Sequence, residues 1–172
     1  MAILIAYYSR AKEKYFDGAY RMIPVGNTKK AAKAIAELTG GTLFRIEQSE
    51  PYSVSYQTRI AEAKKDLQNH ARPALVTMPE NLDDYGEIYL GYPNYWCTMP
   101  MAVYTFLEHF DLTGKTIHPF CTHEGSGISG TSGRIRNTCD GAAASDGFAI
   151  PGTAAEKDRV AAEKQVLDWL EQ

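Results

Sequence analysis

Three short segments of the sequence combine small hydroxyl residues, glycines and aromatic side chains with few charges. The first runs from Ser9 to Thr28 and ends in Val25-Gly26-Asn27-Thr28, directly where a helical pattern begins. Free backbone N–H groups and the helix dipole at such a position favour an anion, and hydroxyl and amide side chains add neutral donors. The alternative interpretation is that Asn27 or Thr28 only caps the helix.

Two further segments have the composition of a site for a flat heterocyclic ligand. Tyr92-Pro93-Asn94-Tyr95-Trp96 places aromatic side chains beside a proline-stiffened turn, which suits stacking on a ring. Thr122-His123-Glu124-Gly125-Ser126-Gly127 offers closely spaced backbone groups that could contact the polar edge of a heterocycle. The alternatives are ordinary buried aromatic residues at the end of a strand and a flexible glycine turn.

Each segment follows a predicted β-strand, so the strands decide whether the three segments meet. The strand pattern recurs at 2–8, 42–46, 87–91, 116–121 and, more weakly, 142–149. Helical spacing recurs between the strands, at 27–39, 99–110, 129–137 and 154–170. This alternation predicts a three-layer, doubly wound α/β domain with five parallel strands. Ligands of such sheets bind outside the carboxyl ends of the strands, where the chain order reverses, so we expect the three segments to lie together.

Helical periodicity also predicts which side chains reach the core, and it leaves two segments unexplained. The predicted core positions of the first and last helices are Ala31, Ile35, Leu38, Val160, Leu167 and Leu170. Residues 10–24 are polar and aromatic without a clear period, so we expect an excursion between the first strand and the first helix. Residues 48–84 are too many for a plain connection, and 58–69 within them have a helical pattern.

Composition limits the classes of protein and partner. The 172 residues suit a single domain, and 44% hydrophobic and 23% charged residues are ordinary globular values. A net charge of −3 and a pI of about 5.8 argue against a nucleic-acid partner. No apolar run approaches the roughly 20 residues that cross a bilayer, so no membrane partner is expected. Three cysteines, none in a CxxC motif, favour a cytoplasmic protein, and the four scattered histidines predict no metal site.

Together, the three segments resemble those of the flavodoxin family, in the same order and over essentially the whole chain. The resemblance implies a flavodoxin-like fold that binds FMN. It assigns the 5′-phosphate to Ser9, Gly26, Asn27 and Thr28. It places the flavin ring between two sets of residues, which are Pro93, Asn94, Tyr95 and Trp96 on one side and Thr122, His123, Glu124, Gly125, Ser126 and Gly127 on the other.

The sequence departs from the family pattern in the first segment. Residues 11–24 split the compact phosphate loop, and Val25 occupies the position of its middle hydroxyl residue. Arg10 is therefore a candidate to supply compensating charge to the phosphate. We also hypothesise that the carboxylate of Glu124 disfavours the fully reduced, anionic flavin; the alternative is that Glu124 points into solvent.

The resemblance implies electron transfer between protein partners through FMN, for which no acid or base catalyst is needed. The alternative is an FMN-dependent NAD(P)H:quinone-type reductase with a small-molecule donor and acceptor, and a third possibility is a flavodoxin-like fold that no longer binds FMN. Residues 125–130 match GxGxxG, but they follow the fourth strand instead of the first, which argues against a dinucleotide site. Cys97 lies beside the aromatic segment, where we expect a small packing residue more than a reactive thiol.

Overall fold

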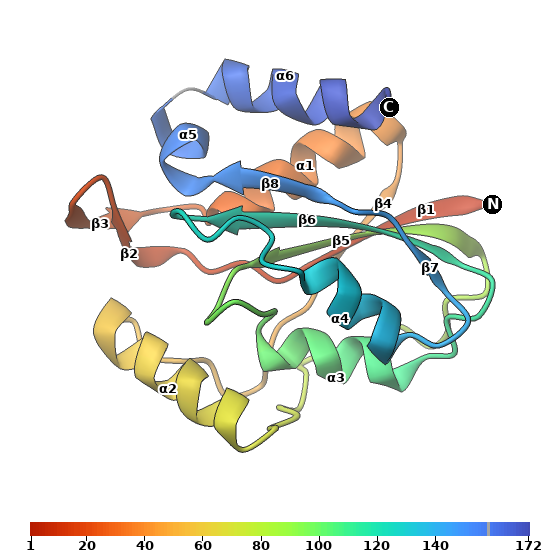
Figure 1. Ribbon diagram of the computed structural model, residues 1–172, viewed down its shortest axis with the longest axis horizontal. Coiled ribbons are helices and arrows are strands. Elements are labelled where there is room, and N and C mark those ends of the chain that lie inside the picture. Colours follow the sequence, from red (N-terminus) through yellow and green to blue (C-terminus); the bar gives the residue numbers. More distant parts are fainter. Residues whose placement is uncertain (158) are drawn as a thin grey trace.

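A parallel β-sheet forms the centre of the computed structural model, and helices cover both of its faces (Figure 1). The structure describes residues 1–157 and 159–172. The sheet strands are β1 (Ala2–Tyr7), β4 (Thr42–Arg45), β5 (Tyr85–Pro93), β6 (Thr116–His123), β7 (Ala143–Ala144) and β8 (Phe148–Pro151). Their order is β4-β1-β5-β6-β7, β8 also pairs with β6, and every pair is parallel. The predicted doubly wound parallel fold is confirmed, and the chain order reverses between β1 and β5.

The central strands are buried on both faces, as the apolar run in the sequence indicates. Along β1, Leu4 and Ala6 pack into the core on one side of the sheet, and Ile5 and Tyr7 pack into the core on the other. This period of two is that of an extended chain with a helix layer on each face.

The fifth position of the sheet differs from the prediction, since two short strands replace one strand over 142–149. β7 pairs with the beginning of β6, and β8 pairs with its end. Between them Gly147 has a φ of 82°, in the left-handed region. A Cβ at this glycine would lie 2.7 Å from the carbonyl oxygen of Pro119 in β6. This backbone conformation ends the pairing, and the chain resumes it with β8.

Two groups of helices form the outer layers (Figure 1). On one face lie α1 (Asn27–Thr39), α5 (Gly152–Lys157) and α6 (Arg159–Leu170), and on the other α2 (Tyr56–Gln68), α3 (Met101–His109) and α4 (Thr131–Thr138). The predicted helix over 154–170 is present as α5 and α6, and residue 158 within it lies outside the described residues.

Some predicted core positions of these helices are wrong. Ala31 and Ile35 of α1 are buried, but Leu38 is 48% exposed. It lies in the last turn of α1, next to β4, which is the outermost strand of the sheet. In the final helix Val160 and Leu167 are exposed, and Val166 is buried in their place. All of these positions lie within α6, whose inner face carries Val166, with Trp169 and the predicted Leu170 packed beside it.

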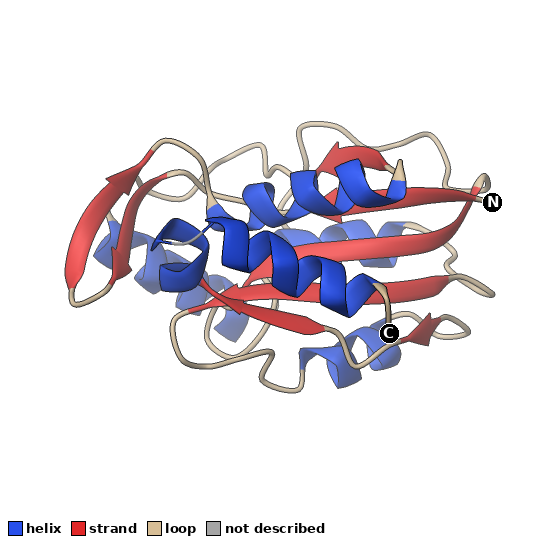
Figure 2. Cartoon of the chain, turned by 90° about the horizontal axis from the view of Figure 1, so that it is seen from above, coloured by secondary structure: helices blue, strands red, loops and turns tan. Residues whose placement is uncertain are grey.

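Residues 10–24 form an antiparallel hairpin of β2 (Lys12–Phe16) and β3 (Ala19–Ile23). Its turn is Asp17-Gly18, with φ values of 53° and 72°. Asp-Gly is a strong signal for a two-residue hairpin, and the sequence analysis missed it because the flanking residues do not alternate. The hairpin extends beyond the carboxyl ends of the sheet strands (Figure 2).

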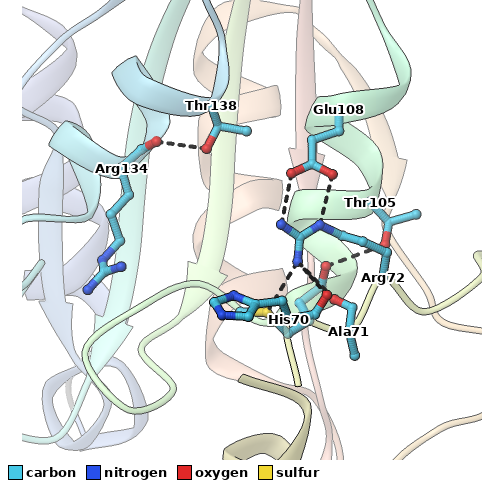
Figure 3. A network of polar contacts seen from close by, with 8 residues as sticks. His70, Ala71, Arg72, Thr105, Glu108, Arg134 and Thr138 are labelled. Carbon is cyan, nitrogen blue, oxygen red and sulfur yellow. Dashed lines mark hydrogen bonds and ion pairs between the residues drawn. The ribbon is translucent and has the colours of Figure 1, made fainter. Parts of the chain in front are cut away.

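An arginine anchors the long segment 48–84 after the end of α2. After the helix, Arg72 forms a bidentate ion pair with Glu108 of α3, with nitrogen–oxygen distances of 2.8 and 2.9 Å (Figure 3). The guanidinium also donates to the carbonyl oxygens of His70 and Ala71. Bidentate arginine–carboxylate pairs fix the relative orientation of the two side chains as well as their distance. This contact ties the excursion that carries α2 to the helix layer below the sheet.

Candidate functional site

An open cleft of about 350 Å³ lies at the carboxyl ends of the sheet strands, where the chain order reverses. This is the location expected for ligands of an open parallel sheet, and the volume is within the usual range of ligand pockets. Most of the predicted site residues line it, namely Asn27, Pro93, Asn94, Tyr95, Trp96, Thr122, His123, Glu124 and Ser126. The structure thus brings together parts of three segments that are far apart in the sequence.

The N-terminus of α1 is capped by a residue from before the hairpin. Ser9 Oγ accepts a hydrogen bond from the backbone N–H of Lys29 at 3.1 Å, whereas the N-cap residue Gly26 has no side chain to do so. Capping by Asn27 or Thr28, the alternative considered from the sequence, is therefore not observed. Gly26 permits this close approach, because a Cβ there would lie 2.2 Å from Ser9 Oγ and 2.5 Å from the carbonyl oxygen of Arg10.

Behind the cleft, Thr28 joins the first segment to the third. Its hydroxyl lies 2.8 Å from that of Thr122, and both residues are buried. Ser9, Gly26 and Thr28 are not themselves part of the cleft lining. They instead fix the start of α1, and Asn27 is the residue among those assigned to the phosphate that reaches the cleft.

Asn27 carries an unsatisfied polar atom at the cleft. Its Oδ1 is buried without a hydrogen-bond partner, and its Nδ2 lies 3.5 Å from the carbonyl oxygen of Gly152, a long hydrogen bond. A buried polar atom left unpaired costs about 1–3 kcal/mol, which a bound ligand with a donor group would offset. The residues at the start of α1 therefore fit a polar ligand at this position.

The aromatic segment is held in a tight turn. Trp96 and Cys97 have φ values of 56° and 60°, and the flanking Tyr95 and Thr98 exchange both backbone hydrogen bonds, as in a type I′ turn. Asn94 Oδ1 accepts a hydrogen bond from the N–H of Cys97 at 2.9 Å. Left-handed conformations at residues other than glycine store strain, which is commonly found at functional sites.

This turn directs its two aromatic side chains to different places. Trp96 is 46% exposed, donates from Nε1 to the carbonyl oxygen of Ile60 in α2 at 2.8 Å, and lies under the ammonium of Lys64. The ring of Tyr95 borders the cleft while its hydroxyl is buried without a partner. Burial raises the pKa of Tyr95, against the opposing effect of Arg59 and then Arg10. The phenol is therefore a neutral wall of the cleft.

The third segment is bonded to the second and is ordered by its histidine. Asn94 Nδ2 donates to the carbonyl oxygen of Gly127 at 2.9 Å, and the N–H of Gly125 donates to Nδ1 of His123 at 2.9 Å. Burial lowers the pKa of His123, an effect that Glu124 partly opposes. Gly125 and Gly127 lie outside the cleft lining, and both have positive φ, which glycine adopts without strain.

Glu124 points toward the beginning of α5. Its Oε2 accepts a hydrogen bond from Thr153 Oγ1 at 2.7 Å. A Cβ on Gly152 would lie 2.2 Å from Glu124 Oε1 and 2.9 Å from Asn27 Nδ2, so the carboxylate and the Asn27 side chain share one end of the cleft. The influence of Glu124 on a reduced flavin stays a prediction.

Arg10 does not line the cleft, contrary to the role considered for it. Its Nη2 donates to the carbonyl oxygens of Tyr52 at 2.7 Å and Ser53 at 3.3 Å, and the residue borders a separate hollow near β4. The hairpin diverts the chain directly after Ser9, and the Arg10 side chain turns toward the segment that precedes α2.

Residues of α2 and the hairpin that were not predicted from the sequence also line the cleft. These residues are Lys14, Tyr15, Tyr56, Arg59, Ile60 and Ala63. Arg59 is only 1% exposed. Arg59 and Ala63 are four residues apart in a predicted helix and so lie on one face, which is the signal that could have placed the arginine inside. Their meeting with the hairpin depends on tertiary structure alone.

Two other kinds of feature are absent within residues 1–157 and 159–172. No group of His, Cys, Asp or Glu side chains is arranged to hold a metal ion. No helix in the described part of the chain is long and apolar enough to cross a membrane.

A doubly wound parallel sheet in the order β4-β1-β5-β6, with a ligand cleft at its reversal point, is characteristic of the flavodoxin-like class of α/β proteins. The family described as Flavodoxin matches residues 18–171, and the chain belongs to this family. The predicted family is therefore confirmed. No curated protein matched the chain.

Solved structures agree with this assignment. A protein from Bacteroides uniformis ATCC 8492 that is assigned as a flavoprotein has 25% identity and a TM-score of 0.76, over 99% of this chain and 98% of the other. One from Bacteroides eggerthii DSM 20697 has 25% identity and a TM-score of 0.74, over 99% and 96%. A flavoprotein from Lactobacillus acidophilus NCFM, solved in complex with FMN, shares the fold at 19% identity and a TM-score of 0.63, over 90% and 95%. The family match agrees with the prediction of FMN as the cofactor.

Proposed function

We propose that this chain binds FMN without a covalent bond and transfers electrons through it. The observation that carries the proposal is the cleft itself, because loops following β1, β5 and β6 meet there. These are the loops that the flavodoxin resemblance assigns to the phosphate and to the two sides of the flavin. The unpaired Oδ1 of Asn27 is an acceptor, so it supports a ligand with a donor group, such as a hydroxyl, at the start of α1.

In the proposed complex the residues of the first segment hold the phosphate. The backbone N–H groups at the start of α1 and its dipole favour the anion, and Asn27 adds an amide donor. Gly26 allows the chain before the hairpin to approach α1, and the paired hydroxyls of Thr28 and Thr122 fix the neighbouring strand end. Glu124 lies at the same end, so its negative charge weakens phosphate binding in this proposal.

The second and third segments hold the ring. Pro93, Asn94, Tyr95 and Trp96 provide one wall, and His123, Glu124 and Ser126 provide the other. When bound, FMN supplies reversible one- and two-electron transfer, and the protein sets its potential by packing and nearby charge. The aromatic walls exclude water from the ring.

The first experiment is an absorption spectrum of the purified protein, before and after addition of FMN and gel filtration. We expect flavin bands that are shifted from free FMN and that stay with the protein. Asn27→Ala should weaken FMN binding, whereas Asn137→Ala, on the exposed face of α4, should not. A protein that leaves added FMN unshifted would contradict the proposal.

One observation favours the reductase alternative as a second candidate. The hairpin, which splits the first segment, and α2, which lies outside the three segments, form an additional wall of the cleft through Tyr15 and Tyr56. Such a wall suits a small-molecule donor or acceptor better than direct contact with a protein surface. Anaerobic mixing of the FMN-loaded protein with NADPH separates the two candidates. Rapid bleaching of the flavin supports a reductase, and bleaching only after addition of a separate reductase supports an electron carrier.

We further propose a reducing, cytoplasmic setting with redox protein partners. The three cysteines are free, and Cys121 and Cys139 are buried. Burial raises the pKa of Cys121 to about 12 and that of Cys139 to about 11. These two thiols are therefore packing residues.

A further inference from the structure

Arg59 is a buried cation in the wall of the cleft. Its side chain comes from α2 and is 1% exposed, yet it lines the cleft. Arginine is almost never fully buried unless it is paired. The groups that surround Arg59 therefore indicate what it is for.

The protein provides hydrogen-bond acceptors for only some of the N–H groups of this guanidinium. Nη2 donates to the carbonyl oxygen of Glu13 in the hairpin at 2.7 Å, and the guanidinium lies 5.3 Å from the ring centroid of Tyr56. Nε and Nη1 are both buried without a hydrogen-bond partner. Within the described residues, no carboxylate forms an ion pair with Arg59. A buried charge without a counter-charge is strongly unfavourable, so this arrangement fits an anionic ligand.

The walls beside Arg59 are aromatic and apolar. The rings of Tyr15 and Tyr56 lie 6.1 Å apart, and Ile60, Ala63 and Trp96 continue the lining. Lys14 adds a second positive charge on the hairpin side. A ligand that matches this part of the cleft has a flat apolar body and one anionic oxygen group.

Arg59 also belongs to a different part of the fold from the proposed phosphate site. The phosphate residues lie at the start of α1, whereas Arg59, Tyr15 and Tyr56 lie on α2 and the hairpin. These two elements hold each other directly, because Glu13 accepts a hydrogen bond from the N–H of Tyr56 at 2.6 Å and Gln57 donates to the hydroxyl of Tyr20 at 2.8 Å. Arg59 is thus held in place by the hairpin and α2 themselves.

From these contacts we infer that the hairpin and α2 form a second ligand site, which binds a small aromatic or similarly flat organic carboxylate with its anionic group on Arg59. That this ligand lies beside FMN rests on the proposed function. The anion site itself does not. The phosphate of FMN is another source of anionic oxygen atoms, so the test must separate it from a second ligand.

The test is calorimetric titration with sodium benzoate, on the protein as purified and again after loading with FMN. Benzamide, which has the same shape without the charge, is the ligand control. We expect benzoate to bind both forms and benzamide to bind at least tenfold more weakly. Arg59→Met should weaken benzoate binding at least tenfold, whereas Arg45→Met, which removes an exposed arginine on β4, should leave it unchanged.

Two further measurements keep the inference falsifiable. If Arg59→Met does not fold, Tyr15→Ala, at a 43% exposed position of the hairpin, should still weaken benzoate binding. If FMN and benzoate exclude one another, and Arg59→Met weakens binding of FMN but not of riboflavin, Arg59 holds the FMN phosphate and the inference is wrong. Absence of benzoate binding to both forms also overturns it. Benzoate binding by a protein that does not bind FMN would leave the anion site standing and contradict only the proposed function.

Discussion

The carboxylate of Glu13 accepts a hydrogen bond from the backbone N–H of Tyr56, which lies 43 positions later in the sequence, and Oε1 is 2.6 Å from the nitrogen. Tyr56 is the first residue of α2, and the N-cap residue Ser55 makes no side-chain capping bond. A residue of the hairpin therefore caps α2. A carboxylate also suits the positive end of the helix dipole. This contact joins the hairpin to α2, and these two elements enclose one side of the cleft.

Glu13→Ala should lower the free energy of unfolding by about 0.5–2 kcal/mol, because it leaves the first N–H of α2 without its cap. Glu13→Gln keeps an oxygen acceptor and loses only the charge, so its loss of stability should be smaller. Urea denaturation of the three proteins measures both effects. Equal stability of Glu13→Ala and the unchanged protein would show that the cap contributes nothing.

Gly26→Ala should impair both stability and FMN binding. The added Cβ would lie 2.2 Å from Ser9 Oγ and 2.5 Å from the carbonyl oxygen of Arg10, so the chain before the hairpin must move away from α1. Overpacking of this kind costs about 1–3 kcal/mol. We expect a lower denaturation midpoint and at least tenfold weaker FMN binding in a fluorescence titration.

Gly133→Ala is the matched control for that experiment. Gly133 lies within α4, and nothing lies within 4 Å of an added Cβ there. Since alanine is the better helix former, this variant should be neutral or more stable by up to about 1 kcal/mol. Similar losses in both variants would mean that the close approach at Gly26 is not the cause.

Cys97→Gly should stabilise the protein by about 0.5–1 kcal/mol. Cys97 has a φ of 60°, which costs a residue with a Cβ about 1–2 kcal/mol, and glycine relieves this at a smaller entropic cost in the unfolded chain. Cys97→Ala removes the exposed thiol and keeps the strain, so it should leave stability unchanged. Thermal denaturation distinguishes the variants. A gain of stability in Cys97→Ala would attribute the effect to the thiol.

Stability should fall on acidification through His123. Burial lowers its pKa below the ordinary 6.5, and its Nδ1 accepts a hydrogen bond that a protonated ring cannot accept. The unfolded chain therefore binds this proton more readily than the folded chain. The stability that neutral His123 contributes is present above pH 6.5 and is lost as the pH falls through its lowered pKa.

Urea midpoints measured between pH 8 and pH 5 test this dependence. His123→Gln should show a shallower decline than the unchanged protein, because it removes the imidazole whose Nδ1 accepts the Gly125 N–H. Identical profiles for the unchanged protein and His123→Gln would contradict the assignment.

Local patterns predicted the elements that position the site. The apolar run at the N-terminus predicted β1, and helical spacing closed by Gly40-Gly41 predicted α1 over 27–39, the range observed. These elements depend on residues close together in the sequence. The last strand and last helix were predicted less well, because Gly147 interrupts the first and the inner face of the second carries Val166 in place of Val160 and Leu167.

The sequence by itself determined the order of strands and helices, the family, and the segments that border the cleft, because each depends on periodicity or on a local motif. Tertiary structure alone decided that Ser9 caps α1, that Arg10 turns away from the cleft, and that Arg59 is buried in its wall. Each of these contacts joins residues that are distant in the sequence. An arginine on a helix can face solvent or the protein interior. Only the packing of the hairpin against α2 places Arg59 in the interior.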